Sequence, residues 1–324
     1  MVRKILAVGI GFVALFGAMA VAASADYPER PITIVVGFPP GGASDIMARI
    51  LTAKLGSLLG QPFMVDNRPG AGGNVAGEVV AHAAPDGYTI LLGNNAILAT
   101  NGSLYEKVGF DAEKDFDPIS LIGTQANVLV VNLSVPAYSL KELIDLAKAN
   151  PGKLNFASSG YGLAAHLAGE LFKTAAHIDI VHVPYKGSAP ALQDVMAGDD
   201  QMMFATTSGV MGFLKNEEVR PLAVTTLKRT AILPDVPTMD EAGLPGFEAT
   251  TWHGLVAPAG TPKNIIETLH RAVVEALKDP DVGQKLAALG IDPVGSAPDE
   301  FRAYIKAEIP KWAAVIKASG AKMQ

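Results

Sequence analysis

The chain has 324 residues, of which 49% are hydrophobic, and it carries 26 basic against 32 acidic side chains. A net charge of −6 argues against nucleic acid as a partner, because nucleic-acid-binding domains carry a basic patch or stripe. The absence of cysteine excludes a disulfide framework and any thiol chemistry.

The first 25 residues have the pattern of a cleaved secretion signal. Arg3 and Lys4 precede an apolar run from Ile5 to Val21, and Ala23-Ser24-Ala25 supplies the small residues of a cleavage site. A retained membrane anchor is the alternative, since the run is about long enough to span a bilayer. Cleavage before Asp26 leaves 24 basic and 32 acidic residues, a net charge of −8, in a chain whose length favours two domains.

The first half alternates short β-branched runs with helical patterns. Strands are predicted over residues 32–38, 63–65, 88–93 and 127–132, and helices over residues 44–60, around 79–80 and over 139–150. We expect Ser44 to cap the first helix and Gly60 to end it.

The second half repeats this plan. Strands are predicted over residues 154–158, 178–185, 219–226 and 251–258, a strand and loop over 201–209, and helices over 163–175 and 188–198. The chain is then expected to be helical to its end, with breaks near Pro280, Pro293 and Pro298. Such alternation predicts the α/β class, with mostly parallel sheets flanked by helices.

Two short strand-like segments are predicted to cross between two domains. They lie near Gln125–Asn127 and Ala249–Trp252. Domain 1 would contain residues 26–125 and 252–324, domain 2 residues 126–251, and a ligand cleft would lie between them. Crossings this short are expected to act as a hinge.

Two glycine-rich loops are the candidate ligand-binding elements. Pro39-Pro40-Gly41-Gly42 leads from a strand into a helix, and Ser158–Gly162 has the same position in the second half. Ligands of parallel sheets bind at the carboxyl ends of the strands, where helix N-termini present unpaired N–H groups. Glycine lets a ligand oxygen approach those groups. A tight turn without a ligand is the alternative for either loop alone, whereas two such loops favour a site between domains.

Two nucleotide-binding motifs are incomplete. Gly72 and Gly77 have the spacing of a phosphate loop, but Glu78 follows where lysine is required. Residues 160–165 match the dinucleotide pattern G-x-G-x-x-A, yet Asp179 lies at the start rather than the end of the next strand. A dinucleotide-dependent enzyme therefore stays open as an alternative.

Hydrolase and metal motifs are also incomplete. Ser158 resembles a nucleophile in a strand-to-helix elbow, but Phe156 stands where glycine is required. The six histidines include no helical i, i+4 pair, so no catalytic residue, metal site or cofactor is predicted. His166 lies one helical turn beyond Gly162, and we expect it to hydrogen-bond the loop or to pack beneath it.

The sequence resembles the Bug family, the periplasmic solute-binding proteins of tripartite tricarboxylate transporters. The stretches that carry the resemblance are YPERPITIVVGFPPGGASDIMAR, DNRPGAGGNVAGEVVAHAAPDGYTILLG, LNFASSGYGLAAHLAGELF, VPYKGSAPALQDVMAGD and TWHGLVAPAGTPKNII. They occur in order across essentially the whole chain that follows the predicted signal.

The resemblance implies a two-domain, type II periplasmic-binding fold that closes on a small carboxylate. It also implies membrane transporter subunits as partners, a monomer in the periplasm, and no enzymatic activity. A ligand-presenting partner of a membrane sensor kinase is the alternative role. The site residues that it implies are Phe38, Pro40, Gly41, Gly42, Asp45 as a brace, Asn94, Asn95, Ser158, Ser159, Gly160, Tyr161, Gly162, Thr206 and Thr207.

One position departs from the family pattern. Ala205 stands where many relatives carry an aspartate that would suit an amino group on the ligand. The resemblance therefore favours a plain carboxylic acid over an amino acid, without naming the acid.

Overall fold

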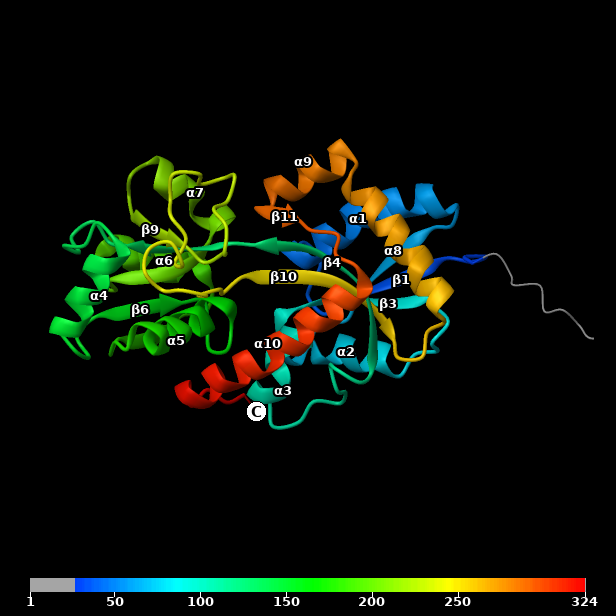
Figure 1. The fold of residues 1–324 in the computed structure, drawn as a ribbon, viewed down its shortest axis with the longest axis horizontal. Coiled ribbons are helices and arrows are strands. Elements are labelled where there is room, and N and C mark those ends of the chain that lie inside the picture. Colours follow the sequence, from blue (N-terminus) through cyan, green and yellow to red (C-terminus); the bar gives the residue numbers. More distant parts are fainter. Residues whose placement is uncertain (1–26, 324) are drawn as a thin grey trace, which may run out of the picture.

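The computed structural model describes residues 27–323, and these form two β-sheets that lie end to end along the long axis of the molecule (Figure 1). The predicted secretion signal lies outside the described residues. Within residues 27–323, no helix combines the length and apolar character needed to cross a membrane.

The first sheet and its helices are called the first lobe. The sheet has the strand order β11-β4-β10-β3-β1-β2. Its strands are β1 (Ile32–Val36), β2 (Phe63–Asn67), β3 (Thr89–Asn94), β4 (Phe116–Gln125), β10 (Thr251–Pro258) and β11 (Ile291–Pro293). The helices of this lobe are α1 (Ala43–Leu59), η1 (Ala71–Gly73), α2 (Asn74–Ala81), η2 (Ala96–Thr100), α3 (Asn101–Leu104), α8 (Lys263–Leu277) and α9 (Pro280–Ala288).

The second sheet and its helices are called the second lobe. The sheet has the strand order β7-β6-β8-β5-β9. Its strands are β5 (Asn127–Val131), β6 (Asn155–Ser158), β7 (Val181–Pro184), β8 (Met202–Thr206) and β9 (Arg220–Val224). The helices are α4 (Leu140–Ala149), α5 (Ala164–Ala176), α6 (Ser188–Ala197) and α7 (Thr207–Lys215).

The predicted α/β class is confirmed, and both sheets are mixed. The strands that lead into helices pair in parallel, β1 with β2 and β3, and β6 with β7 and β8. The crossing strands β4, β5 and β10 pair antiparallel with their neighbours. The expectation of mostly parallel sheets therefore fails for these strands, because they carry the chain between lobes without the helical crossover that parallel pairing needs.

Two local predictions were wrong. Gly42, with φ −78° and ψ 165°, occupies the N-cap of α1 in place of Ser44, whose hydroxyl instead lies 3.1 Å from the His253 Nε2. The segment after β8 is the helix α7, where a loop was expected. Gly60 does end α1, and its left-handed φ of 69° favours glycine.

A single residue links the lobes on the first passage of the chain. Ala126 is buried between the end of β4 and the start of β5, and the return runs from β9 to β10 through residues 225–250. Both passages are visible at the centre of Figure 1, where β4 and β10 lie side by side.

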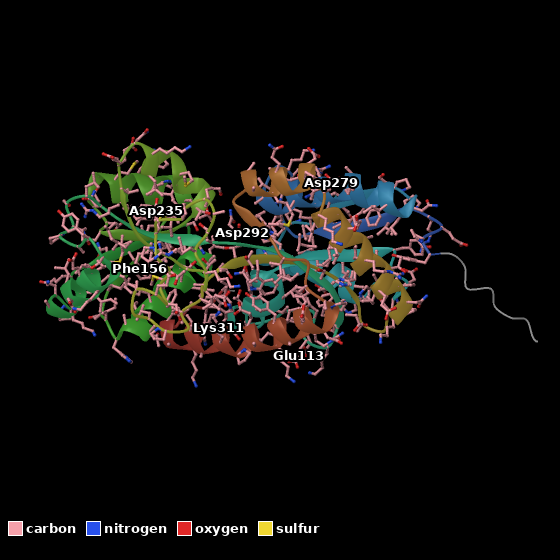
Figure 2. The ribbon with its side chains drawn as sticks, turned by 45° about the horizontal axis from the view of Figure 1, so that its top comes forward. Glu113, Phe156, Asp235, Asp279, Asp292 and Lys311 are labelled. Carbon is pink, nitrogen blue, oxygen red and sulfur yellow. The ribbon has the colours of Figure 1, made fainter. Side chains whose placement is uncertain are left out.

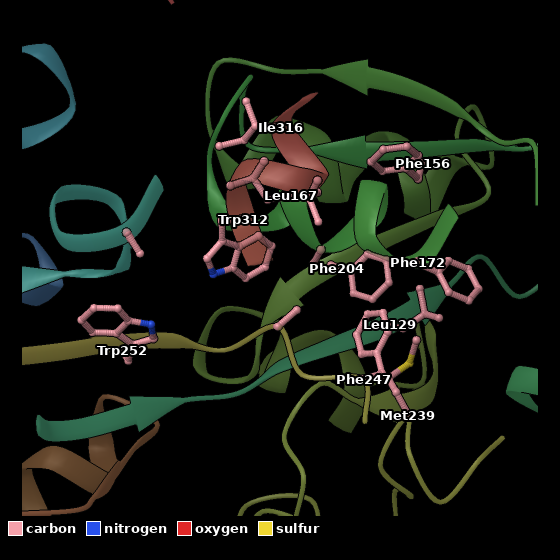
Figure 3. Close-up of a cluster of buried hydrophobic side chains, with 14 of the residues drawn as sticks. Leu129, Phe156, Leu167, Phe172, Phe204, Met239, Phe247, Trp252, Trp312 and Ile316 are labelled. Carbon is pink, nitrogen blue, oxygen red and sulfur yellow. The ribbon is translucent and has the colours of Figure 1, made fainter. Parts of the chain in front are cut away.

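The helix α10 (Pro298–Ser319) joins the lobes along one side of the molecule (Figure 1). It packs on β4 of the first lobe and on α5 of the second lobe. Trp312 and Ile316 belong to the same apolar cluster as Leu167 and Phe172 of α5 (Figure 3). The hydrophobic core is therefore continuous between the lobes on the α10 side.

Glu308 of α10 stabilises the packing of α10 between the two lobes through a buried hydrogen-bond network. It is 4% exposed, and one carboxylate oxygen accepts hydrogen bonds from the indole N–H of Trp252 at 3.0 Å and of Trp312 at 2.7 Å. Lys311 Nζ lies 2.6 Å from the other oxygen. Because a buried charge is stable only when it is paired and hydrogen-bonded, this network ties the start of β10 to the part of α10 that reaches the second lobe.

Replacing Glu308 with alanine should lower the free energy of unfolding by about 2–4 kcal/mol. Two buried indole N–H groups lose their acceptor, and each unpaired group costs about 1–3 kcal/mol. Urea unfolding measures the loss. Glu308→Gln keeps an oxygen acceptor and should cost less, and Glu267→Ala, which removes an exposed pair with Lys263, should stay within about 0.5 kcal/mol. Equal stability of Glu308→Ala and Glu267→Ala would contradict this role.

Candidate functional site

The loop between β1 and α1 is held by a buried carboxylate. Asp45 is 2% exposed, and one of its oxygens accepts a hydrogen bond from the Gly41 N–H at 2.9 Å. Arg49 and Asn67 donate to the same carboxylate at 3.0 Å. The Arg49 hydrogen bond holds the pKa of Asp45 down to about 2, so the carboxylate stays charged and the loop stays anchored.

Gly41 and Gly42 are both exposed at the surface of this loop. Gly41 has a φ of 83°, which favours glycine. The expectation that both glycines offer free amides is wrong, because the Gly41 N–H already donates to Asp45 and the Gly42 N–H donates to the Pro39 carbonyl at 3.4 Å. Gly42 opens the helix with no side chain over its first turn.

The loop between β6 and α5 rests on two histidines. The Gly162 N–H donates to His166 Nδ1 at 3.0 Å, and the Ser158 hydroxyl lies 2.6 Å from His182 Nε2. The two imidazoles are stacked with their centroids 4.0 Å apart, and the Tyr161 ring packs edge-on against both. The expected contact between His166 and the loop is confirmed, and it occupies the Gly162 amide.

Both imidazoles are neutral at pH 7. Burial lowers the pKa of His166 to about 4 and that of His182 to about 3, with Lys173 and the other imidazole as further causes for His182. Glu170, on the same helix, lies 3.9 Å from His166 Nε2. Since Nδ1 of His166 accepts the Gly162 hydrogen bond, its proton is on Nε2, and protonation of Nδ1 would break that contact.

A cavity of about 180 Å³ lies between the two lobes. Five predicted site residues line it, from both lobes: Phe38, Asn94, Asn95, Tyr161 and Gly162. The first turn of α5 also reaches the cavity, through Leu163 and Ala164. Among residues 27–323, no Asp, Glu, Lys, Arg or His side chain lines it. An anion in this cavity would be met by N–H and O–H donors rather than by a cation.

The other predicted residues lie outside this cavity. Thr207 lines a second one, of about 260 Å³, together with Gly290 and Asp292 of the first lobe. Figure 2 shows Asp292 on the side of the first lobe that faces the second. The remaining residues line neither cavity: Pro40, Gly41, Gly42, Asp45, Ser158, Ser159, Gly160 and Thr206.

Several lining residues were not predicted from the sequence. Leu163 and Ala164 directly follow a predicted loop, so their position at the start of a helix could have indicated them. Leu104 and Met323 carry no such signal, because the Met323 N–H reaches the Leu104 carbonyl at 2.8 Å only through tertiary contact. Ala205 is buried in β8 opposite Val128 and does not line the cavity.

Metal chemistry finds no support in the described part of the chain. Among residues 27–323, no group of three or more His, Cys, Asp or Glu side chains is arranged to hold a metal ion.

Comparison with protein families matches residues 47–321 to the tripartite tricarboxylate transporter family receptor. Protein BugT of Bordetella pertussis is 40% identical over 325 residues, covering 100% of this chain and 99% of that protein. A UPF0065 protein from the tcbD-tcbE intergenic region of a Pseudomonas species is 42% identical over 291 residues, covering 90% of this chain and 86% of its own.

Two solved structures are also similar to this chain over most of its length. An R. palustris protein with adipate is 39% identical and has a TM-score of 0.75, covering 92% of this chain and 100% of that one. MatC from Rhodopseudomonas palustris with bound malate is 34% identical and has a TM-score of 0.71, covering 90% and 100% of the two chains.

The histidine pair predicts a pH dependence of stability. In the unfolded chain the histidine pKa is about 6.5, so the unfolded state binds more protons than the folded state below that pH. Stability is therefore complete above about pH 6.5 and falls as the pH drops towards the folded value of about 4 for His166. His166→Asn, which keeps an acceptor for the Gly162 N–H, should reduce the fall in melting temperature between pH 6.5 and 4.5.

The fall in melting temperature of His166→Asn is compared with that of wild type, because carboxylates and the buried His253 titrate in both proteins. His82→Asn replaces an exposed histidine on the first lobe and should leave the wild-type pH dependence unchanged. An identical pH dependence of melting for wild type and His166→Asn would show that His166 is not held neutral by the fold.

Proposed function

This chain belongs to the tripartite tricarboxylate transporter receptor family, and we propose that it captures a small organic acid in the periplasm for a membrane transporter of that type. The family consists of solute receptors rather than enzymes. The observation that carries the proposal is the uncharged cavity between the lobes, to which both lobes contribute residues of the glycine loops or their neighbours. Relatives solved with adipate and malate support a carboxylate as the ligand.

Helix N-termini supply the donors that such a ligand needs. The first-turn N–H groups of a helix lack partners within the helix and carry partial positive charge. The start of α5 lines the cavity at Ala164, and α1 starts directly after the exposed Gly42. A carboxylate between them would be bound without a cationic side chain, as at other anion sites on helix N-termini.

Closure of the lobes would complete the site. The exposed Gly41 and Gly42 would approach Ser159 and Gly160 of the opposite loop, and contacts made only in this form would favour it. We propose that residues 26–125 and 252–324 move as one domain against residues 126–251. Because the core is continuous along α10, the lobes would pivot on that side and open on the side of α7 and α9.

The expected affinity is micromolar. Hydrogen bonds to a charged carboxylate contribute about 1.5–3 kcal/mol each, so about four of them approach the roughly 8 kcal/mol of a micromolar Kd. Ordering of side chains and desolvation subtract several kcal/mol and keep the affinity well below picomolar.

The predicted signal in residues 1–25 supports a periplasmic location for the mature protein, where we propose that it acts as a monomer. Its closed form would be recognised by the membrane subunits of the transporter.

Gly42→Val should weaken ligand binding by at least about 100-fold, equivalent to about 2.7 kcal/mol. The branched side chain would cover the N-terminus of α1 where a ligand oxygen must approach. The fold should persist, because Gly42 has a φ of −78° and an added Cβ would meet only the Pro39 carbonyl, at 3.4 Å. Calorimetry with adipate, malate, benzoate and citrate identifies the tightest acid for wild type, and that acid is then titrated into the variant.

Gly283→Val is the matched control. It adds the same side chain to α9 at a position where the added Cβ would meet no atom within 4 Å beyond its chain neighbours and its own helix, and it should leave binding unchanged. Wild-type affinity in Gly42→Val would exclude the α1 N-terminus from the site. Failure of wild type to bind any organic acid would contradict the proposed function itself.

A further inference from the structure

The polar groups of the interlobe cavity are of two kinds, those engaged within their own lobe and those without a partner. The Asn101 amide donates to the Gly72 carbonyl at 3.1 Å and to Asn74 Oδ1 at 2.7 Å, and the Thr100 hydroxyl donates to the Ala96 carbonyl at 3.3 Å. These groups hold the first lobe together and are not available to a ligand.

Three lining residues near the ends of β3 and β10 keep free hydrogen-bonding groups, in addition to the hydroxyls of Tyr105 and Tyr161, which have no hydrogen bond to residues 27–323. Asn94 Nδ2, the Asn95 amide and the Thr251 hydroxyl have no hydrogen bond to any residue from 27 to 323, although Asn94 Oδ1 accepts from the Ile97 N–H. Asn94 pairs with His253 across β3 and β10, and Thr251 lies two residues before His253. The free groups of Asn94, Asn95 and Thr251 are therefore gathered at one end of the cavity, where β3 ends and β10 begins.

The other walls of the cavity are hydrocarbon. Leu104 lies against the loop of the second lobe so closely that a side chain at Gly162 would collide with it. Met323 lies beside Leu104 and Tyr105 through the hydrogen bond and β-bridge of the C-terminal segment, and Leu163 adds a further apolar wall. None of these side chains offers a strong donor or acceptor except the Tyr105 hydroxyl.

A cavity with polar groups at one end and apolar side chains on its other walls should bind some organic acids more tightly than others. We infer that the ligand is a carboxylic acid with an unsubstituted hydrocarbon body, aliphatic or aromatic, rather than a hydroxy acid; the inference rests on the proposed function. The carboxylate that the helix N-termini hold would also take the free amides and hydroxyl of Asn94, Asn95 and Thr251, and the body would lie against Leu104, Leu163 and Met323. A hydroxyl on the part of the body that faces these three side chains would leave water without gaining a partner, and such a loss weakens binding by about 10- to 100-fold.

The size of the cavity agrees with this class. An apolar cavity of about 150 Å³ holds a benzene molecule, so about 180 Å³ accepts one aromatic ring or a short aliphatic chain.

The test is calorimetric titration of the mature protein with acids that differ by one hydroxyl. The pairs are adipate with 3-hydroxyadipate for an aliphatic body, and 3-phenylpropionate with 3-(4-hydroxyphenyl)propionate for an aromatic body. The member without the hydroxyl should bind at least about tenfold more tightly in the pair that the protein accepts. Equal or tighter binding of the hydroxy acid would overturn the inference and leave the proposed function intact. Binding of no acid in either pair, nor of malate, benzoate or citrate, would overturn both.

Leu163→Asn tests the apolar wall directly. Leu163 is the N-cap residue of α5, a position where asparagine is preferred, so the variant should fold. The preference for the acid without a hydroxyl should shrink about threefold or more. Leu133→Asn is the matched control, because both leucines are 47% exposed and Leu133 lies outside the cavity. A preference that is unchanged in Leu163→Asn, or equally reduced in Leu133→Asn, would contradict the assigned wall.

Discussion

An anion that leaves water for a cavity without cationic side chains must be held by N–H and O–H donors alone. This constraint is strict for the present chain, because its net charge, −6 for the full sequence and −8 without the predicted signal, repels an organic acid at long range. The favourable charge must therefore be local, and helix N-termini at the carboxyl ends of β1 and β6 are the elements of the fold that could supply it. Binding of a carboxylate by neutral donors from both lobes would also link capture to closure, since neither lobe holds the full set.

The two glycine-rich loops are held more rigidly than their glycine content suggests. Asp45 fixes the first loop through the Gly41 amide, and His166 fixes the second through the Gly162 amide. Both anchors are buried and hold one protonation state at neutral pH, the carboxylate charged and the imidazole neutral. Some backbone amides of the glycine loops therefore already donate hydrogen bonds that hold the loop in its conformation. Pre-organised loops lose less conformational freedom when a ligand binds, which favours affinity.

Much of the fold could be predicted from the sequence, because helical and strand periodicity identify elements whose residues face a core. The regular runs of β1, α1, β6 and α5 were of this kind. The strand β4 was missed because Pro118 and Gly123 interrupt its pattern, and α7 because Thr207, Ser208 and Gly209 resemble a turn. Of the candidate site, the positions of the glycine loops followed from general rules for parallel sheets. The wall formed by Leu104 and Met323 did not, because contacts between distant segments leave no local pattern.

The central claim is that the two lobes close on an organic acid. A distance measured between the lobes tests this claim most directly. The chain contains no cysteine, so Gln284→Cys on α9 and Lys215→Cys on α7 accept two spin labels, at exposed positions on opposite lobes. Pulsed electron paramagnetic resonance measures the distance between the labels with and without the acid that binds tightest by calorimetry. Closure predicts a shorter and narrower distance distribution at saturation. An unchanged distribution, at a concentration where calorimetry shows full binding, would contradict capture between moving lobes.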